Sequence, residues 1–135
     1  MEKGMLGRED ILEILKGAPF LGEDCWLASG AALVLYGVKE QTRDIDLVCT
    51  TELADRLEAQ GVAFRRSPLG NTRIFAYSGQ IEVLENWETD EVIQVEGLPA
   101  ASLLSIRKQK EALGREKDWA DIRRIDAFLE GRKRT

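Results

Sequence analysis

The spacing of hydrophobic and polar residues along the chain alternates between helix-like and strand-like periods. Apolar residues recur at helical spacing in five segments, which predict helices over 9–16, 31–35, 52–60, 101–113 and 117–130. Shorter apolar or alternating segments predict strands over 25–28, 44–48, 62–66, 72–77, 80–87 and 92–95. The strands between 62 and 87 are joined by turn residues, so they are expected to form an antiparallel edge of a sheet. This mixture predicts an α+β protein.

The strand over 44–48, Asp-Ile-Asp-Leu-Val, places two acidic residues on one face. Side chains alternate along a strand, so Ile45 and Leu47 share one side while Asp44 and Asp46 share the other. The two aspartate Cα atoms are expected roughly 6.5 Å apart. Two negative charges at this spacing cost free energy unless a cation or a hydrogen-bond donor offsets them, and a divalent metal ion is the simplest such cation.

A Ser-Gly turn joins the first predicted strand to the helix over 31–35. Gly30 leaves room for close backbone approach, and the first N–H groups of the helix are free to meet an anion. The alternative is that Ser29 only caps the helix. The loop after this helix presents Thr42 and Arg43 beside the acidic strand.

This region resembles the signature of the polymerase-beta-like nucleotidyltransferase superfamily in the order Ala28-Ser29-Gly30, Ala32-Leu33, Gly37, Thr42, Asp44-Ile45-Asp46-Leu47. Within that superfamily it is most similar to small bacterial and archaeal nucleotidyltransferases, which include toxin-type members of toxin–antitoxin systems. The resemblance implies a mixed β-sheet flanked by helices, with C-terminal helices. It also implies that the Ser-Gly turn binds a triphosphate and that the Asp-x-Asp strand binds Mg²⁺ or Mn²⁺.

The resemblance implies a third acidic residue on a later strand. Glu82 follows the aliphatic Ile81 in the strand over 80–87, as the acid does in the family, and is assigned this role. It is one methylene longer than the usual aspartate. Glu85 is the alternative, and an ordinary solvated glutamate on an edge strand is the simplest explanation of Glu82.

The segment over 110–121 resembles the C-terminal motif of the small transferases. By this resemblance Lys110, Arg115 and Lys117 face the nucleotide. The alternative is a solvent-exposed charged loop between two helices. Asp118 then serves only as a negative charge that favours the N-terminal end of the last helix.

Length and composition narrow the choice of function. The 135 residues predict one domain over 1–135. The net charge of -5 argues against a protein that binds a nucleic acid duplex by broad neutralisation of its phosphates. The longest uncharged stretch, 25–38, is too short for a membrane-spanning helix, and no signal peptide is visible, so a cytoplasmic protein without a membrane partner is expected.

The chain contains no histidine, which excludes histidine-based catalytic triads, general bases and metal ligands. Any metal site must then use mainly oxygen ligands, which favours a hard cation. The two cysteines, Cys25 and Cys49, lack the spacing of a zinc site or a disulfide framework, and both are predicted to be buried and reduced.

These observations predict a metal-dependent nucleotidyltransferase that moves a nucleoside monophosphate from a nucleoside triphosphate to a hydroxyl acceptor. Asp44, Asp46 and Glu82 are the predicted catalytic residues and metal ligands. The predicted nucleotide-binding residues are Ser29, Gly30, Thr42, Arg43, Lys110, Arg115 and Lys117. Small molecules, proteins and tRNA are all open as acceptors, a toxin–antitoxin role is one expectation, and a homodimer that completes the cleft is another.

The alternative is a catalytically inactive binding or regulatory protein that keeps the nucleotidyltransferase fold. Three departures from the family pattern favour it, the first of which is a short chain that is expected to leave little room for an acceptor domain. Glu82 stands where an aspartate is usual, and Glu40 stands where family members often carry a basic residue.

Overall fold

The computed structural model describes residues 5–18, 21–22, 24–68, 70–87 and 89–133, and the fold is given for this part of the chain. The strands are β1 (Cys25–Ala28), β2 (Ile45–Cys49), β3 (Phe64–Arg66), β4 (Arg73–Ala76), β5 (Ile81–Glu85), β6 (Val92–Val95) and β7 (Leu98–Ala101). The helices are α1 (Arg8–Leu15), α2 (Ser29–Tyr36), α3 (Thr51–Ala59), α4 (Leu103–Leu113) and α5 (Glu116–Lys133).

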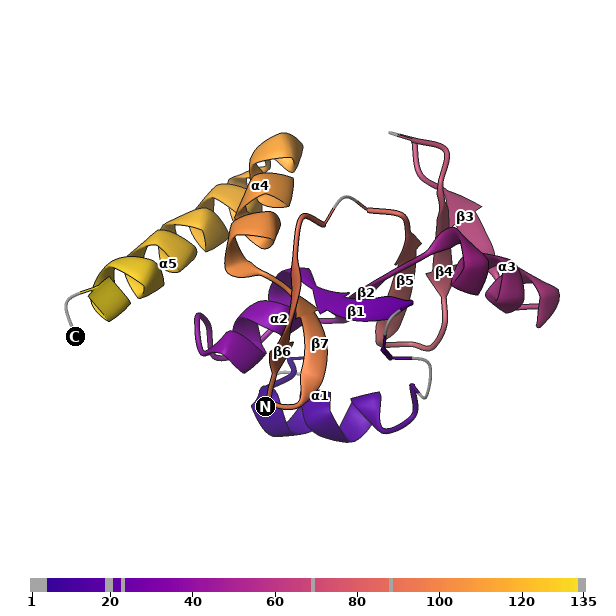
Figure 1. Cartoon of the computed structure of the whole chain (residues 1–135), viewed down its shortest axis with the longest axis horizontal. Coiled ribbons are helices and arrows are strands. Elements are labelled where there is room, and N and C mark those ends of the chain that lie inside the picture. The colour runs from indigo at the N-terminus through magenta and orange to yellow at the C-terminus, as the bar shows by residue number, and fades with distance from the viewer. Residues whose placement is uncertain (1–4, 19–20, 23, 69, 88, 134–135) are drawn as a thin grey trace.

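All seven strands belong to one mixed sheet with the order β3-β4-β5-β2-β1-β7-β6 (Figure 1). Strand β2 lies at its centre, antiparallel to β1 and parallel to β5. The predicted antiparallel edge is formed by β3, β4 and β5. The predicted fold class, a mixed sheet flanked by helices and followed by C-terminal helices, is therefore confirmed.

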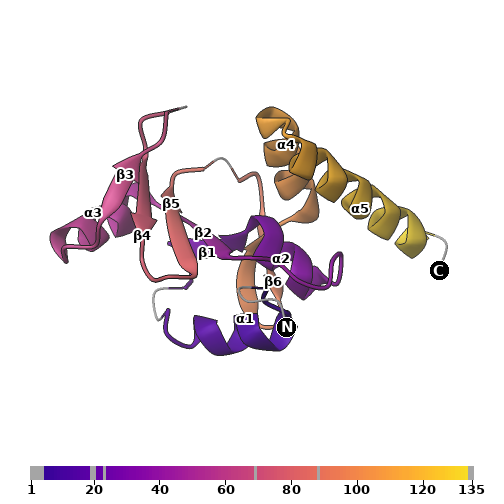
Figure 2. The same cartoon turned by 180° about the vertical axis from the view of Figure 1, so that it is seen from behind.

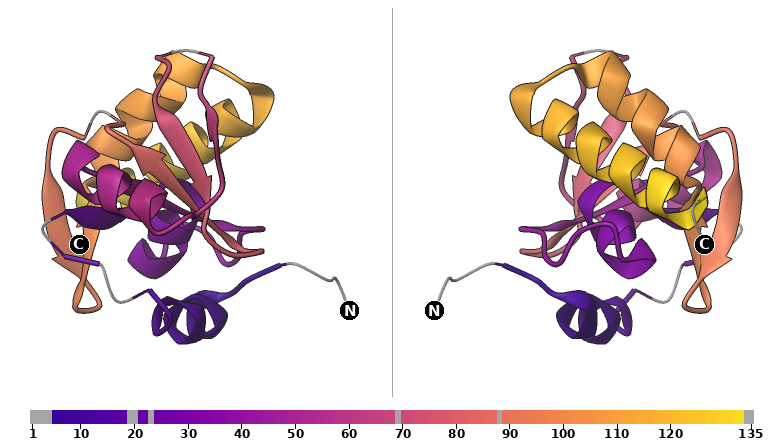
Figure 3. Two further views of the ribbon diagram at one scale, coloured as in Figure 1. Left: turned by 90° about the vertical axis from the view of Figure 1, so that its right-hand side faces the viewer. Right: turned by 90° about the vertical axis from the view of Figure 1, so that its left-hand side faces the viewer.

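The helices lie on different sides of the molecule. Helices α4 and α5 pack against each other on one side, and α1 lies on the opposite side, as the views from the front and from behind both show (Figures 1 and 2). Figure 3 shows the same separation from the two ends. None of the described helices is both long and apolar enough to cross a bilayer.

The alternation predicted for β2 decides which side of the sheet is filled. Ile45, Leu47 and Cys49 are completely buried and belong to the main core, together with residues of α1, α2 and α3. On the other face Val48 belongs to a small second cluster of Ala28, Ile74 and Leu84. This second face is only partly covered, which leaves space above Asp46. The two cysteines are buried and free, as predicted.

No strand is predicted between 95 and the helix predicted to begin at 101, and this is wrong. The turn after β6 is formed by Glu96 and Gly97, which both have positive φ, as a type I′ β-hairpin turn requires. The following residues form β7, which pairs with β6 and with β1, and α4 begins only at Leu103. Ser102 is the N-cap, and its side chain accepts a hydrogen bond from the backbone N–H of Ser105.

Candidate active site

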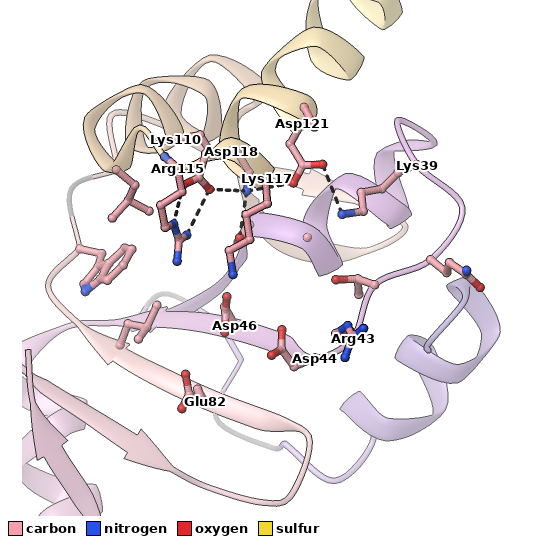
Figure 4. Close-up of a pocket in the computed structure, with 18 of the residues that line it drawn as sticks. Lys39, Arg43, Asp44, Asp46, Glu82, Lys110, Arg115, Lys117, Asp118 and Asp121 are labelled. Carbon is pink, nitrogen blue, oxygen red and sulfur yellow. Dashed lines mark hydrogen bonds and ion pairs between the residues drawn. The ribbon is translucent and has the colours of Figure 1, made fainter. Parts of the chain in front are cut away.

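A cavity of about 560 Å³ lies between the second face of the sheet and the helix pair α4 and α5 (Figure 4). Its floor is formed by β2 and β5, and one end is closed by the N-terminus of α2 and the loop that follows that helix. All ten residues predicted for the site line this cavity. They are Ser29, Gly30, Thr42, Arg43, Asp44, Asp46, Glu82, Lys110, Arg115 and Lys117.

The floor of the cavity is acidic. Asp46 lies in β2 and Glu82 in β5, directly opposite each other in the parallel register of the two strands. Asp44 immediately precedes β2 and points into the same cavity (Figure 4). Residues separated by many positions in the sequence are thus brought to one surface by the pairing of β2 with β5.

Asp46 is in an electrostatically unfavourable position. Burial raises the pKa of its carboxyl group to about 6, and the negative charges of Asp44 and Glu82 add to this effect, while Lys110 and Lys117 oppose it. Its side chain is in no ion pair or hydrogen bond within the described part of the chain. An added cation at this position would therefore stabilise the ionised carboxylate.

Glu82 already has a basic partner. Its carboxylate accepts a hydrogen bond from Arg65 at 2.9 Å, and both side chains remain partly exposed. The alternative third acid, Glu85, is wrong, because Glu85 does not line the cavity. Its buried carboxylate is bound by Arg73, whose hydrogen bonds lower the pKa of Glu85 to about 2.

The acidic residues face one cavity without forming a complete metal cage. Among the described residues, no group of three or more acidic, cysteine or histidine side chains is placed to hold a metal ion by itself. Asp44 and Asp46 nevertheless fit Mg²⁺, which commonly uses one or two protein carboxylates together with water and substrate phosphates. The negative charges of Asp44 and Glu82 near Asp46 also favour a cation at this position.

The Ser-Gly turn has an unusual backbone. Ser29 has a φ of 52°, in the left-handed region, and the N-cap of α2 is Ala28, with no side-chain cap. The interpretation of Ser29 as an ordinary helix cap is therefore wrong. Its hydroxyl instead accepts a hydrogen bond from the Lys110 ammonium group at 3.4 Å. A serine held in this conformation beside a cation is consistent with strain stored at a functional site.

Gly30 is needed because Thr42 packs against it. A Cβ atom at position 30 would lie far inside contact distance of the Thr42 hydroxyl and 3.2 Å from the Thr42 Cβ. Thr42 is buried, and its backbone is fixed by two hydrogen bonds with Leu6. The group that comes close to Gly30 in the structure is thus the Thr42 side chain.

We expect Gly30→Ala to destabilise the protein by roughly 1 to 3 kcal/mol, the usual cost of forcing an extra methyl group into a packed position. Chemical denaturation measures this directly. Gly79→Ala is the matched control, because a Cβ at position 79 meets nothing within 4 Å. The added change Thr42→Ala removes the clashing hydroxyl and should restore part of the loss. An additive double variant would show that Thr42 is not the cause.

The opposite side of the cavity carries a cluster of basic residues around two aspartates, here called the basic cluster. It comprises Lys39, Lys110, Asp118, Arg115, Asp121 and Arg124, all of which line the cavity. Four basic side chains share two carboxylates through ion pairs, so the cluster keeps a net charge of +2. Figure 4 shows it facing the acidic floor.

The centre of the basic cluster is buried. Lys110 is only 5% exposed, and its ammonium group lies 3.1 Å from Asp121 and 3.6 Å from Asp118. Asp118 is completely buried. Burial pushes the pKa of Asp118 upward, but hydrogen bonds from Arg115 and the charge of Lys110 outweigh it and lower this pKa.

The structure thus corrects two interpretations of the segment 110–121. Lys110 is not part of a solvent-exposed loop, because it lies in α4 and is buried. Asp118 is more than a charge that favours the helix dipole, because its carboxylate bonds Arg115 and Lys110. Lys39 and Asp121 were not predicted as site residues. The spacing of Asp118 and Asp121, three positions apart on one helical face, is the signal that could have revealed the pair.

Lys117 and Arg43 differ from the basic cluster, because neither is in an ion pair with another described residue. Lys117 lies in the first turn of α5 and extends toward Asp46 (Figure 4). Its charge lowers the pKa of Asp46. These two cations are available to a ligand without first leaving a carboxylate.

The cavity as a whole is more positive than the protein. Seven basic and five acidic side chains line it, a balance of +2, whereas the whole chain carries -5. The floor carries only carboxylates, Asp44, Asp46 and Glu82, whereas the basic cluster on the opposite side keeps a surplus of positive charge although it contains Asp118 and Asp121. Such a cavity suits a ligand that presents a cation to the floor and anionic groups to the helices.

Comparisons with known proteins identify no family. No family model matches the chain, and no curated protein matches it. Among solved structures, a lincosamide antibiotic adenylyltransferase, LnuA, with lincomycin bound, is similar over 86% of this chain and 92% of its own, with 17% sequence identity and a TM-score of 0.45. This similarity is too low to assign the chain to the family of that enzyme.

Proposed function

We propose that this protein is a metal-dependent nucleotidyltransferase that moves a nucleoside monophosphate from a nucleoside triphosphate to a hydroxyl group. The observation that carries the proposal is the cavity in which the acidic floor of Asp44, Asp46 and Glu82 faces the basic cluster. A triphosphate with a divalent cation matches both sides at once. A ligand with only one sign of charge would leave one side of the cavity unpaired.

Different residues of the cavity would bind the metal ion and the phosphates of such a ligand. Asp44 and Asp46 would hold Mg²⁺ or Mn²⁺, which when bound would lower the pKa of the acceptor hydroxyl and offset the negative charge of the reacting phosphate. Lys117, Arg43 and the basic cluster would bind the phosphates electrostatically. The backbone N–H groups at the N-terminus of α2 would add hydrogen bonds to the same end of the triphosphate.

Glu82 would receive the proton of the acceptor hydroxyl, since it shares the floor with Asp46 and the chain has no histidine. Oxygen of the acceptor would then form a bond to the α-phosphorus while the bond to pyrophosphate breaks. Arg65 has to release Glu82, or move with it, before this carboxylate can accept a proton.

The ion pair between Arg65 and Glu82 favours a second candidate function, a protein that binds a nucleotide without transferring it. A carboxylate that stays bound to Arg65 is not free to receive the proton of an acceptor hydroxyl. The second candidate keeps the basic cluster and the metal ligands but forms no product. Nucleotide binding without pyrophosphate release would support it.

We expect nucleoside triphosphates to bind only when Mg²⁺ or Mn²⁺ is present. Isothermal titration calorimetry measures this binding. The double variant Asp44→Asn/Asp46→Asn should bind at least about tenfold more weakly, because the metal loses both carboxylates. Asp126→Asn is the matched control, since this exposed carboxylate pairs with Arg107 outside the cavity. Equal affinity of the double variant and the wild type would overturn the proposed metal site.

A further inference from the structure

A second cavity of about 440 Å³ adjoins the first. It lies between the connection of β3 to β4 on one side and α4 on the other, two segments that face each other across the chain after β5 (Figure 1). Ser67, Thr72, Asn86 and Gln109 are among the polar residues that line it, and Ala112 lies on its helical wall.

The two cavities adjoin, because Trp87 and Leu113 line both. The floor also changes from acidic to apolar residues toward the second cavity. On this face of the sheet Asp46 is followed by the buried Val48 along β2, and Glu82 by the buried Leu84 along β5, in matching register. Trp87 packs against this apolar pair. A ligand in the second cavity therefore lies beyond the apolar end of the acidic floor.

The direction of the transfer reaction decides which substrate this cavity suits. An attacking hydroxyl and the leaving pyrophosphate lie roughly in line on opposite sides of the reacting phosphorus. The pyrophosphate end is set by Ser29 and Lys110, at the β1 side of β2. The second cavity is lined by Thr72, just before β4, and by Asn86, just after β5, so it lies on the β5 side of β2, the side that carries Glu82.

The chemistry of the second cavity differs from that of the first. Its ionisable lining residues are Asp90 and Lys108, which form an ion pair with each other at 3.4 Å and leave no net charge. Its other groups are hydroxyls, amides and the apolar surfaces of Trp87, Ala112 and Leu113. A polyanion finds no surplus of positive charge here, whereas an uncharged ligand with hydroxyl groups and an apolar face finds both kinds of contact.

We propose that the second cavity binds the acceptor and that the acceptor is a small, uncharged hydroxyl compound with an apolar face, such as a glycoside. This inference rests on the proposed function. The oxygen of one acceptor hydroxyl forms a bond to the α-phosphorus of the nucleotide, the bond to pyrophosphate breaks, and the hydroxyl proton passes to Glu82. The volume fits a single small molecule rather than a segment of folded RNA.

The first test uses two neutral probes, phenyl β-D-glucopyranoside and octyl β-D-glucopyranoside, titrated into the isotopically labelled protein and followed by NMR. We expect shifts at the Trp87 indole and at the amides of Thr72 and Gln109. Ala112→Trp fills the cavity from an exposed helix position and should remove these shifts. Ala127→Trp is the matched control, an exposed alanine on α5 that lines neither cavity.

Three results would overturn the inference. The first is that the glycosides cause no shifts at these residues. The second is that the nucleotide alone shifts them, which would make the second cavity a site for the base, and the third is that a short RNA hairpin shifts them while the glycosides do not. Mg²⁺-nucleotide binding, measured in the same samples, tests the proposed function separately, because Ala112→Trp leaves the first cavity unfilled.

The second test follows the transferred group. The protein is incubated with an α-labelled nucleoside triphosphate and either the uncharged small-molecule fraction of a cell extract or total tRNA. We expect label to enter a new anionic product only from the uncharged fraction, and Ala112→Trp to lose this product while Ala127→Trp keeps it. Label in tRNA alone overturns the assignment of the acceptor, and nucleotide binding without label in any fraction supports the non-catalytic candidate instead.

Discussion

Replacing Asp46 with Asn is expected to lower turnover by on the order of a thousandfold, because the asparagine amide is a poor substitute for a carboxylate that holds a divalent cation against the reacting phosphate. The measurement is pyrophosphate release from the preferred nucleoside triphosphate in the presence of Mg²⁺. Full activity of this variant would remove Asp46 from the catalytic site.

The same substitution is expected to stabilise the protein when no metal is present. The pKa of Asp46 is raised to about 6 in the folded protein, mainly by burial, from about 4 in an unfolded chain. The folded state therefore holds a proton that the unfolded state has lost, and stability falls as the pH rises through this window. Asn carries no charge at any pH, so the variant avoids this loss.

The gain should be near zero at pH 4 and roughly 1 to 3 kcal/mol at pH 8, since each unit of pKa corresponds to about 1.4 kcal/mol and partial exposure of the side chain reduces the effect. Denaturation with a chelator present at both pH values measures it. Asp126→Asn serves as the control, because the guanidinium of Arg107 lowers the pKa of Asp126. A gain at pH 4 that equals the gain at pH 8 would contradict the electrostatic explanation.

Local patterns were sufficient to place Asp44 and Asp46 together and to identify the Ser-Gly turn, whereas Glu82 was assigned by family resemblance. The alternation in β2 fixes which side chains share a face, whatever the rest of the chain does, so Asp44 and Asp46 could be placed together from sequence alone. Gly30 could be identified because a glycine at the turn into a helix leaves room for another group to come close to the backbone. That its neighbour is Thr42 could not be predicted, because that contact depends on the path of the intervening loop.

Contacts between segments far apart in the sequence could not be predicted from the sequence. Strand β7 was missed because Pro99 read as a turn residue, whereas the true turn uses Glu96, a residue that rarely adopts positive φ. The bond from Arg65 to Glu82 depends on β3 lying beside β4, and the burial of Asp118 depends on how α4 packs against α5. Each of these changes the chemistry of a predicted site residue.

The arrangement also explains why Lys110 needs two acidic partners. A buried ammonium group without a counter-ion would lose its proton or destabilise the fold. Asp118 and Asp121 are the counter-ions of Lys110, and its ammonium group also lies beside Ser29. The shared cations Lys39 and Arg124 then restore the positive charge that these aspartates remove.

Asp118→Ala is therefore expected to destabilise the protein by roughly 3 to 5 kcal/mol, the usual cost of removing one partner from a buried ion pair. The carboxylate is completely buried and accepts hydrogen bonds from both the backbone and the side chain of Arg115. Its loss leaves the buried Lys110 with Asp121 as its remaining anionic partner in the described structure. Chemical denaturation at neutral pH measures the loss.

Two further variants separate the ion pair from simple loss of packing. Asp126→Ala removes an exposed carboxylate from its pair with Arg107 and should cost at most about 1 kcal/mol. The double variant Asp118→Ala/Lys110→Met removes both buried charges, so it should be less destabilised than the sum of the two single variants. If the two losses simply add, Asp118 stabilises the fold through its bonds to Arg115 alone, and Lys110 is held by Asp121 without its help.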